Sequence, residues 1–260
     1  MTTSQPESGR VGFLPRRLRA VVAGVAGAAG DVVRLGSAVR RSGTDRALWL
    51  LRYAEDLLGG QASAASRLPV DASRRPLPWY TYPAIEYLEQ LDFSACDVFE
   101  YGSGNGSKYW SRRARTVTSV EADPRWYESG ARELAANQQL LLREEKAGYV
   151  NALHRAGTNF EIIVIDGAYR YNCAIEAVKR LKDGGLIVLD NSDWFPNTAK
   201  VLRDAGYTQV DFAGVGPVNA YAWCTSMYFQ SRLAVSRKDD QVVIRVLGGL
   251  VQQGENDRLV

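Results

Sequence analysis

Histidine and cysteine are scarce in this sequence, and their scarcity excludes several kinds of site. The 260 residues include one histidine, His154, so a metal centre built on two histidines, such as that of a two-histidine metalloprotease, is excluded. The three cysteines are odd in number and too widely spaced for a zinc knuckle, so reduced thiols in the cytoplasm are the simplest expectation. They are Cys96, Cys173 and Cys224.

Long apolar runs are also missing. The longest uncharged stretch near the start, Ala20–Gly30, has eleven residues, whereas a membrane-spanning helix needs about 20 apolar residues. The arginines before it could belong to a secretory signal. However, apolar residues recur at helical spacing through and beyond the stretch, which favours an amphipathic helix. They are Leu18, Val22, Val25, Ala29, Val32 and Val39.

The charge is unevenly distributed, although the total is only +3. Residues 1–75 contain twelve arginines, no lysine and six acidic residues, a net charge of +6, whereas the remainder carries 20 basic and 23 acidic residues. Two helices are predicted in the basic segment, Pro15–Arg41 and Thr44–Leu58. The segment suits either peripheral contact with an anionic membrane or dimerisation, and both alternatives stay open.

A change of composition marks the end of the basic segment. The Ser/Ala-rich stretch Gln61–Ser66 and the turn Pro76-Leu77-Pro78 are typical of a linker. Three regions are therefore predicted: a basic helical extension and linker over residues 1–75, a larger domain over residues 76–230, and a C-terminal tail over residues 231–260.

From Trp79 onward, short apolar runs alternate with helical stretches, which is typical of βαβ units and a parallel sheet. The predicted strands are Asp97–Tyr101, Thr116–Glu121, Gln139–Arg143, Glu161–Asp166, Leu186–Asp190, Thr208–Phe212 and Ala222–Phe229. The predicted helices are Gly106–Ala114, Pro124–Asn137, Lys146–Arg155, Asn172–Leu181 and Pro196–Ala205. No helix separates the last two strands, so that pair should be antiparallel.

A glycine-rich segment closes the first predicted strand and opens a helix: Glu100-Tyr101-Gly102-Ser103-Gly104-Asn105-Gly106. Glycines allow a tight turn and a close approach of the backbone to a ligand, at which the helix N–H groups point. The second predicted strand ends at Glu121, where a carboxylate can accept hydrogen bonds from both ribose hydroxyls. This order of elements predicts a nucleoside-binding site.

The acid-x-Gly-x-Gly-x-Gly spacing of this segment resembles the first motif of class I S-adenosylmethionine-dependent methyltransferases, and the resemblance extends over about Trp79 to Gln230. It implies an α/β fold with a doubly wound, mostly parallel seven-stranded sheet in the order 3-2-1-4-5-7-6. It also implies that S-adenosylmethionine is the cofactor, with its ribose at Glu121. The implied cofactor-binding residues are Glu100, Gly102, Ser103, Gly104, Gly106, Glu121 and Asp166.

A second polar group of residues stands at the ends of the fourth and fifth predicted strands: Asp166, Asp190 and Asn191. Ligands of a doubly wound sheet bind beyond the carboxyl ends of its strands, so these are the catalytic candidates. Their oxygens suit Mg²⁺ or another divalent cation. The arrangement is similar to the metal site of catechol and caffeoyl-coenzyme A O-methyltransferases, which implies a metal that orients and acidifies a substrate hydroxyl.

The resemblance to those metal-dependent enzymes is incomplete. Tyr169 stands in the place of their lysine base, followed by Arg170, and neither type of side chain is a base at neutral pH. Asp166 could instead act alone as a base or cofactor contact, and Asp190-Asn191-Ser192 could merely begin a helix. Tyr80 could cover a cofactor or staple the next helix, and Trp223 could contact an acceptor or be buried in the sheet.

The sequence therefore predicts a cytoplasmic enzyme that transfers a methyl group to an oxygen of a small molecule, such as a sugar or secondary metabolite. No nucleic-acid partner is expected, because the positive charge lies outside the larger domain. Two rival interpretations are an NAD-dependent oxidoreductase and a non-catalytic nucleotide-binding or membrane-associated scaffold. Ser107 disfavours the oxidoreductase, because a dinucleotide fingerprint has its third glycine at that position.

Overall fold

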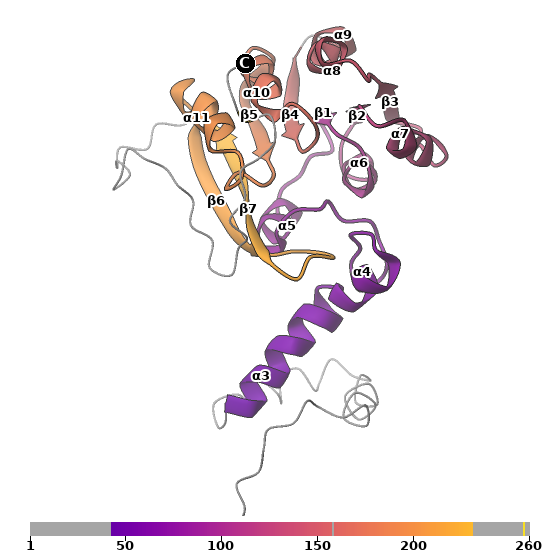
Figure 1. Cartoon of the computed structure of the whole chain (residues 1–260), viewed down its shortest axis with the longest axis vertical. Helices are drawn as coiled ribbons and strands as arrows, with labels where there is room; N and C mark the ends of the chain where they lie inside the picture. Colours follow the sequence, from indigo (N-terminus) through magenta and orange to yellow (C-terminus); the bar gives the residue numbers. More distant parts are fainter. Residues whose placement is uncertain (1–42, 158, 231–256, 258–260) are drawn as a thin grey trace, which may run out of the picture. The chain divides into compact units, whose positions relative to one another are not determined.

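The computed structural model describes residues 43–157, 159–230 and 257 (Figure 1). The chain divides into two compact units between Arg52 and Tyr53. The described part of the first unit is helix α3, Gly43–Arg52, and the second unit starts with a π-helical turn, η1, Tyr53–Leu57. The predicted helix Thr44–Leu58 is thus α-helical only over its first part.

Several sequence predictions concern residues outside this description. The predicted helix Pro15–Arg41 lies there, as does the tail 231–260 apart from Asp257. The membrane and dimer alternatives for the basic segment therefore stay predictions. Among the helices that the structure does describe, none has the length and apolar character needed to cross a membrane.

A seven-stranded sheet lies at the centre of the second unit, in the order β3-β2-β1-β4-β5-β7-β6. Its strands are parallel except β7, which is antiparallel to both β5 and β6. The predicted order and the antiparallel last pair are confirmed. The strands are β1 Asp97–Tyr101, β2 Thr116–Glu121, β3 Gln138–Leu142, β4 Phe160–Ile165, β5 Leu181–Leu189, β6 Thr208–Val215 and β7 Ala222–Phe229.

Alternate residues of the central strands face two separate cores. In β4, Ile163 and Ile165 belong to one core, and Ile162 and Val164 belong to the other. Because both faces of the strand are buried, its sequence is apolar almost throughout rather than alternating.

Helices from different parts of the chain cover the two cores. Four helices contribute to the first core: α8 Lys146–Val150, α9 Ala152–Ala156, α10 Arg170–Val178 and α11 Pro196–Asp204. Two contribute to the second: α5 Tyr82–Glu89 and α6 Asn105–Ser111. Helix α7, Pro124–Ala131, lies between β2 and β3 in the sequence and starts at the N-cap Asp123, whose side chain accepts a hydrogen bond from the backbone N–H of Arg125.

Strand β5 begins five residues earlier than predicted. The stretch to Leu181 was predicted as helix, but Leu181 pairs with Phe160 and Leu186 pairs with Ile162, so β5 carries an irregular insertion against β4. Gly184 within the insertion has φ +73°, a conformation that glycine adopts without strain. Gly184 and Gly185 therefore mark a bulge inside the strand rather than a turn before it.

The predicted linker Gln61–Ser66 is instead a helix, α4, Gly60–Ser66. Its Ser63 is fully buried, donates a hydrogen bond to the Val70 carbonyl (2.7 Å) and accepts one from the Val70 N–H (3.0 Å). The Asn105 side chain donates to the carbonyl of Pro69 at 2.8 Å. These hydrogen bonds hold α4 to the segment that follows it, and hold that segment against the start of α6.

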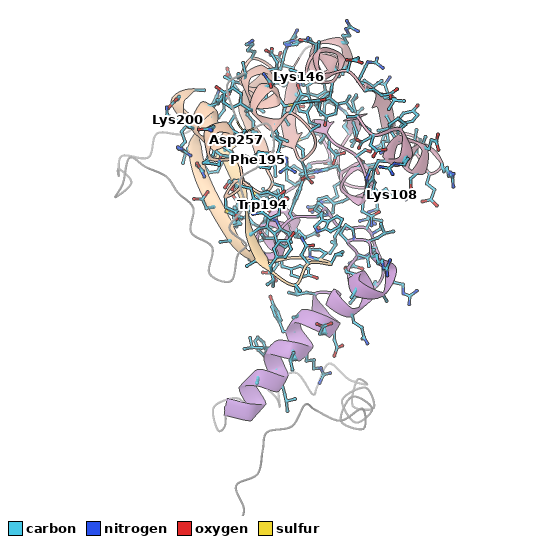
Figure 2. All side chains as sticks on the ribbon, viewed as in Figure 1. Lys108, Lys146, Trp194, Phe195, Lys200 and Asp257 are labelled. Carbon is cyan, nitrogen blue, oxygen red and sulfur yellow. The ribbon has the colours of Figure 1, made fainter. Side chains whose placement is uncertain are left out.

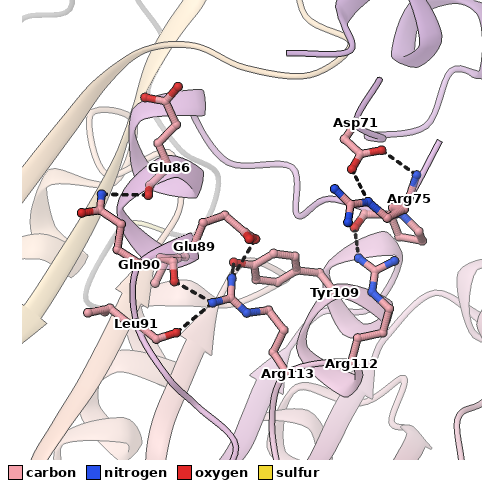
Figure 3. A network of polar contacts seen from close by, with 11 residues as sticks. Asp71, Arg75, Glu86, Glu89, Gln90, Leu91, Tyr109, Arg112 and Arg113 are labelled. Carbon is pink, nitrogen blue, oxygen red and sulfur yellow. Dashed lines mark hydrogen bonds and ion pairs between the residues drawn. The ribbon is translucent and has the colours of Figure 1, made fainter. Parts of the chain in front are cut away.

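Arg113 ties the end of α5 to α6 (Figure 3). Its Nη2 donates to the carbonyls of Leu88 and Leu91, both at 2.9 Å, and its Nη1 donates to Glu89 at 2.7 Å. The carbonyls at a helix C-terminus lack partners within the helix, so a cation there is favourable. This network positions the helix that precedes β1.

Asp257 caps the N-terminus of α11, although it lies 59 residues after Thr198 in the sequence. Its carboxylate accepts from the backbone N–H groups of Asn197 (2.9 Å) and Thr198 (2.8 Å) and from the Thr198 hydroxyl (2.7 Å). Figure 2 shows Asp257 close to Phe195, at the start of this helix. The capping carboxylate is fully buried, so it supplies the partners that the first turn of α11 lacks.

We expect Asp257→Ala to lower the free energy of unfolding by about 1 to 2 kcal/mol, because the helix loses its cap. Urea unfolding of the full chain measures this. Asp204→Ala, at the exposed end of the same helix, is the matched control and should change stability by less than about 0.5 kcal/mol. Equal effects of the two substitutions would contradict the capping role.

Candidate active site

The glycine-rich turn lies between β1 and α6, at the carboxyl end of β1. Gly102 has φ +106°, and a Cβ there would lie 2.9 Å from the Asp166 carbonyl oxygen of β4. Gly104 has φ +148°, yet a Cβ there would meet only the Trp126 ring, at 4.0 Å. Conformation therefore requires glycine at Gly104, while the space beside it stays open to a ligand.

Glu100 supports this turn through a chain of hydrogen bonds. Its side chain is buried, and Oε2 accepts hydrogen bonds from the hydroxyls of Ser119 (2.7 Å) and Ser107. Ser107 in turn accepts the Gly104 N–H at 3.2 Å, so a polar chain links the acid to the turn. A Cβ at Gly106 would lie 2.8 Å from Glu100 Oε1, so a larger residue there would displace the Glu100 carboxylate. Burial raises the pKa of Glu100 to about 7.

Glu121 ends β2 and faces the same turn. Its Oε2 accepts the Ser103 hydroxyl at 2.8 Å, and its Oε1 accepts the backbone N–H groups of Ala122 (2.7 Å) and Asp123 (3.0 Å). These contacts fix the carboxylate at the carboxyl edge of the sheet. The structure thus brings together the predicted cofactor residues of β1 and β2.

Asp166, Asp190 and Asn191 share one partner, the guanidinium of Arg170. Arg170 donates from Nη2 to Asp166 Oδ1 (3.0 Å), and from Nη1 to Asn191 Oδ1 (3.0 Å) and to the main-chain carbonyl of Asp190. Its Nε donates to the Gly167 carbonyl at 3.1 Å. The three predicted catalytic residues are therefore close together, but a protein cation lies among them.

The Asp190 carboxylate is buried and directed toward β7. Its Oδ1 accepts the Trp223 indole N–H (3.0 Å) and the Thr225 hydroxyl (2.5 Å). Burial raises the pKa of Asp190 well above its usual value, and the negative charge of Asp166 adds to this effect. Trp223 is fully buried and supports Asp190, which agrees with the sheet-burial alternative for this tryptophan.

The metal interpretation of these residues does not fit the geometry. Asp166 Oδ1 and Asn191 Oδ1 already accept hydrogen bonds from Arg170, and Asp190 Oδ1 accepts from Trp223 and Thr225. Within the described ranges, no group of three or more histidine, cysteine, aspartate or glutamate side chains could hold a metal ion. Those residue types do not include asparagine, and the contacts of Asp166, Asp190 and Asn191 give the predicted metal site no support, so it stays a prediction.

The helix-capping alternative for Asp190-Asn191-Ser192 is also wrong, because α11 begins at Pro196. Asn191 instead has φ +52°, and its carbonyl accepts the Trp194 N–H at 2.8 Å. Asparagine tolerates this left-handed conformation better than most residues. The turn directs the Asn191 side chain to Arg170.

Two aromatic residues join the site. Tyr80 is almost fully buried; burial raises the pKa of its hydroxyl, and the nearby carboxylates Asp166 and Glu100 raise it further. Trp126, in α7, is 47% exposed, although its ring reaches the open side of Gly104. Trp126 was not among the site residues predicted from the sequence; the signal that could have found it is its position five residues after Glu121.

Comparisons with known proteins concern the fold. No family model matches the chain, and no curated protein matches its sequence. A solved rRNA methylase from Streptococcus thermophilus is 12% identical, with a TM-score of 0.45 over 58% of this chain and 98% of that one. A methyltransferase from Pyrococcus furiosus is 19% identical, with a TM-score of 0.43 over 73% of this chain and 98% of that one.

Two further structures show a similar degree of likeness. A precorrin-6y C5,15-methyltransferase from Geobacter metallireducens is 16% identical, with a TM-score of 0.42 over 56% of this chain and 87% of that one. A spermidine synthase from Thermotoga maritima is 15% identical, with a TM-score of 0.42 over 53% of this chain and 54% of that one. The function is accordingly inferred from the site residues.

We expect Glu100→Gln to alter the pH dependence of stability. The pKa of Glu100 is raised in the folded chain from 4.5 to about 7, so between these pH values the folded chain keeps a proton that the unfolded chain has lost. Glu100 therefore makes its full contribution to the free energy of unfolding below pH 4.5, and this contribution is lost as the pH rises to about 7. The free energy of unfolding of the wild type should decrease over that pH range, and that of Glu100→Gln should decrease less.

Urea unfolding at pH 5 and pH 8 measures the difference, which should reach about 3 kcal/mol at most. Glu128→Gln, on the exposed surface of α7, controls for the loss of a carboxylate as such. Parallel pH curves for wild type and Glu100→Gln would contradict the buried, proton-holding state of Glu100.

Proposed function

We propose that the chain is an S-adenosylmethionine-dependent methyltransferase. The observation that carries the proposal is the joint placement of Glu100, the turn Gly102–Gly106 and Glu121 at the carboxyl ends of β1 and β2, with Ser103 linking the turn to Glu121 at 2.8 Å. In a doubly wound sheet this edge is where ligands bind.

The Glu121 carboxylate suits a ribose. A carboxylate offers about four lone-pair sites for hydrogen bonds, and three of them are used in Glu121. One ribose hydroxyl can take the remaining site, and the other can replace the Ser103 hydroxyl. The two backbone N–H groups on Oε1 keep the carboxylate in place during this exchange.

The charge of the site supports a cationic cofactor over a dinucleotide. Desolvation raises the pKa of Asp166 most, and Glu100 and Glu121 lie close enough for their negative charges to raise it further. A sulfonium and an ammonium group relieve this repulsion, whereas the pyrophosphate of NAD would increase it. The acidic surroundings of the turn therefore argue against the oxidoreductase alternative.

S-adenosylmethionine supplies an activated methyl group when bound. The chain has to hold the acceptor in line with that group and exclude water. Asp166 is suited to receive the acceptor proton: its side chain is 24% exposed, and Oδ2 carries no hydrogen bond from the described residues. The bound cofactor would supply the methyl carbon and keep the electron pair of the broken C–S bond on sulfur, while the proton of the acceptor oxygen would pass to Asp166.

We propose O-methylation of a small molecule as the reaction. Asp166 receives the proton, Asp190 holds the β5 end in place through Trp223 and Thr225, and Asn191 anchors Arg170. The absence of a nucleic-acid partner stays a prediction, and the panel of acceptors to be tested should include RNA beside sugars and phenols.

We expect the full chain to bind S-adenosylmethionine at micromolar strength, and Glu121→Ala to weaken binding about tenfold to a hundredfold, because a charged hydrogen-bond acceptor is lost. Isothermal titration calorimetry measures both. Glu128→Ala, an exposed glutamate on α7, is the matched control and should bind like wild type.

The same titrations performed with NAD separate the two cofactor classes. The proposal requires that NAD binds at least about a hundredfold more weakly than S-adenosylmethionine, a difference of nearly 3 kcal/mol. Absence of S-adenosylmethionine binding by the folded wild type, or equal binding of NAD, would end the proposal.

A further inference from the structure

The guanidinium of Arg170 bonds to the three residues that resemble a metal-ligand set. It donates four hydrogen bonds: to Asp166 Oδ1, to Asn191 Oδ1, to the Asp190 main-chain oxygen and to the Gly167 main-chain oxygen. Two of these oxygens belong to side chains that could ligate an ion. A cation already lies where the ion would be.

The surroundings of Arg170 keep this cation in place. Its side chain is about one-tenth exposed, and its guanidinium lies 4.5 Å from the centre of the Phe195 ring. Tyr169 before it has φ +54°, and Arg170 starts α10 directly after that residue. A guanidinium that is hydrogen-bonded to several oxygens and stacked on an aromatic ring has little freedom to move aside for another ion.

The charges also favour a single protein cation. The Asp190 carboxyl group is buried and the Asp166 side chain is 24% exposed, so an unpaired negative charge is costly at both. Arg170 supplies one positive charge and directional N–H groups, whereas the Asp190 carboxylate is turned to Trp223 and Thr225. A divalent ion beside the guanidinium would meet a like charge and too few free oxygens.

We propose that Arg170 is a built-in substitute for the divalent cation of this type of site, which makes the site metal-independent. It holds Asp166 and the Asp190-Asn191 turn in the arrangement that a metal would otherwise impose. Its role as a positioning residue for the acceptor rests on the proposed methyltransferase function, whereas its occupation of the cation position does not.

Mn²⁺ binding to the full chain, followed by electron paramagnetic resonance after removal of metals with a chelator, tests the proposal. Wild type should bind no Mn²⁺ through Asp166. Arg170→Met, which keeps an apolar stem beside Phe195, should bind one Mn²⁺ at least about tenfold more tightly than wild type, because the carboxylates lose their cation. The double variant with Asp166→Asn should lose this gain.

Arg113→Met is the matched control, because Arg113 also combines an ion pair, with Glu89, with a stacked ring. Its other hydrogen-bond partners are main-chain carbonyls and the Tyr109 hydroxyl rather than a second side chain that could ligate an ion. It should gain no Mn²⁺ site. Near-ultraviolet circular dichroism checks that each variant is folded. If Arg170→Met does not fold, Mn²⁺ binding by the wild type is compared with that by Asp166→Asn. Negligible binding by both proteins supports the proposal.

A wild-type Mn²⁺ site that Asp166→Asn removes would overturn the proposal, as would a folded Arg170→Met that binds no more Mn²⁺ than wild type. Calorimetry with S-adenosylmethionine on the same wild-type sample separates the two levels of inference. Failure of that titration contradicts the proposed function and leaves the Mn²⁺ result to stand by itself.

Discussion

Arg170 connects the ends of two strands on which the acceptor side of the site depends, through its ion pair with Asp166 (3.0 Å) and its hydrogen bond to Asn191 (3.0 Å). Asp166 follows β4, Asn191 follows β5, and Arg170 starts α10 between them. Parallel strands end in carbonyl groups and turns that have no partners of their own in the sheet. One guanidinium satisfies several of these acceptors and balances the charge of Asp166.

A similar principle operates on the cofactor side, with hydroxyl groups in place of a cation. Ser107 and Ser119 donate to Glu100, and Ser103 donates to Glu121. The two acids are thus held by neutral donors, and the raised pKa of Glu100 reflects this incomplete compensation. A positively charged ligand would complete it, which connects the electrostatics of the turn to the proposed cofactor.

The sheet could be predicted from the sequence because each central strand is a short apolar run between helices, and the strand order followed from the resemblance that the glycine-rich motif carries. The start of β5 could not, since Lys182-Asp183-Gly184-Gly185 has the composition of a turn and pairs only through a bulge. The small residues of α4 likewise have no helical periodicity, and burial of Ser63 against Val70 stabilises that helix.

The placement of the candidate site residues at one edge of the sheet could be predicted from the sequence, but the contacts among them could not. The sequence placed Asp166, Asp190 and Asn191 at one edge, which the structure bears out through their shared contact with Arg170. It could not indicate that Arg170 would point into the group rather than into solvent. That direction depends on the left-handed Tyr169 and on the turn at Asn191, both of which form only in the folded chain.

A crystal structure of the full chain grown with S-adenosylhomocysteine and Mn²⁺ tests the central claim most directly. The account predicts the ribose hydroxyls within hydrogen-bond distance of Glu121, the thioether beyond Gly104, and Arg170 still bonded to Asp166 with no metal between Asp166 and Asn191. A nucleoside bound away from Glu121 would contradict the account.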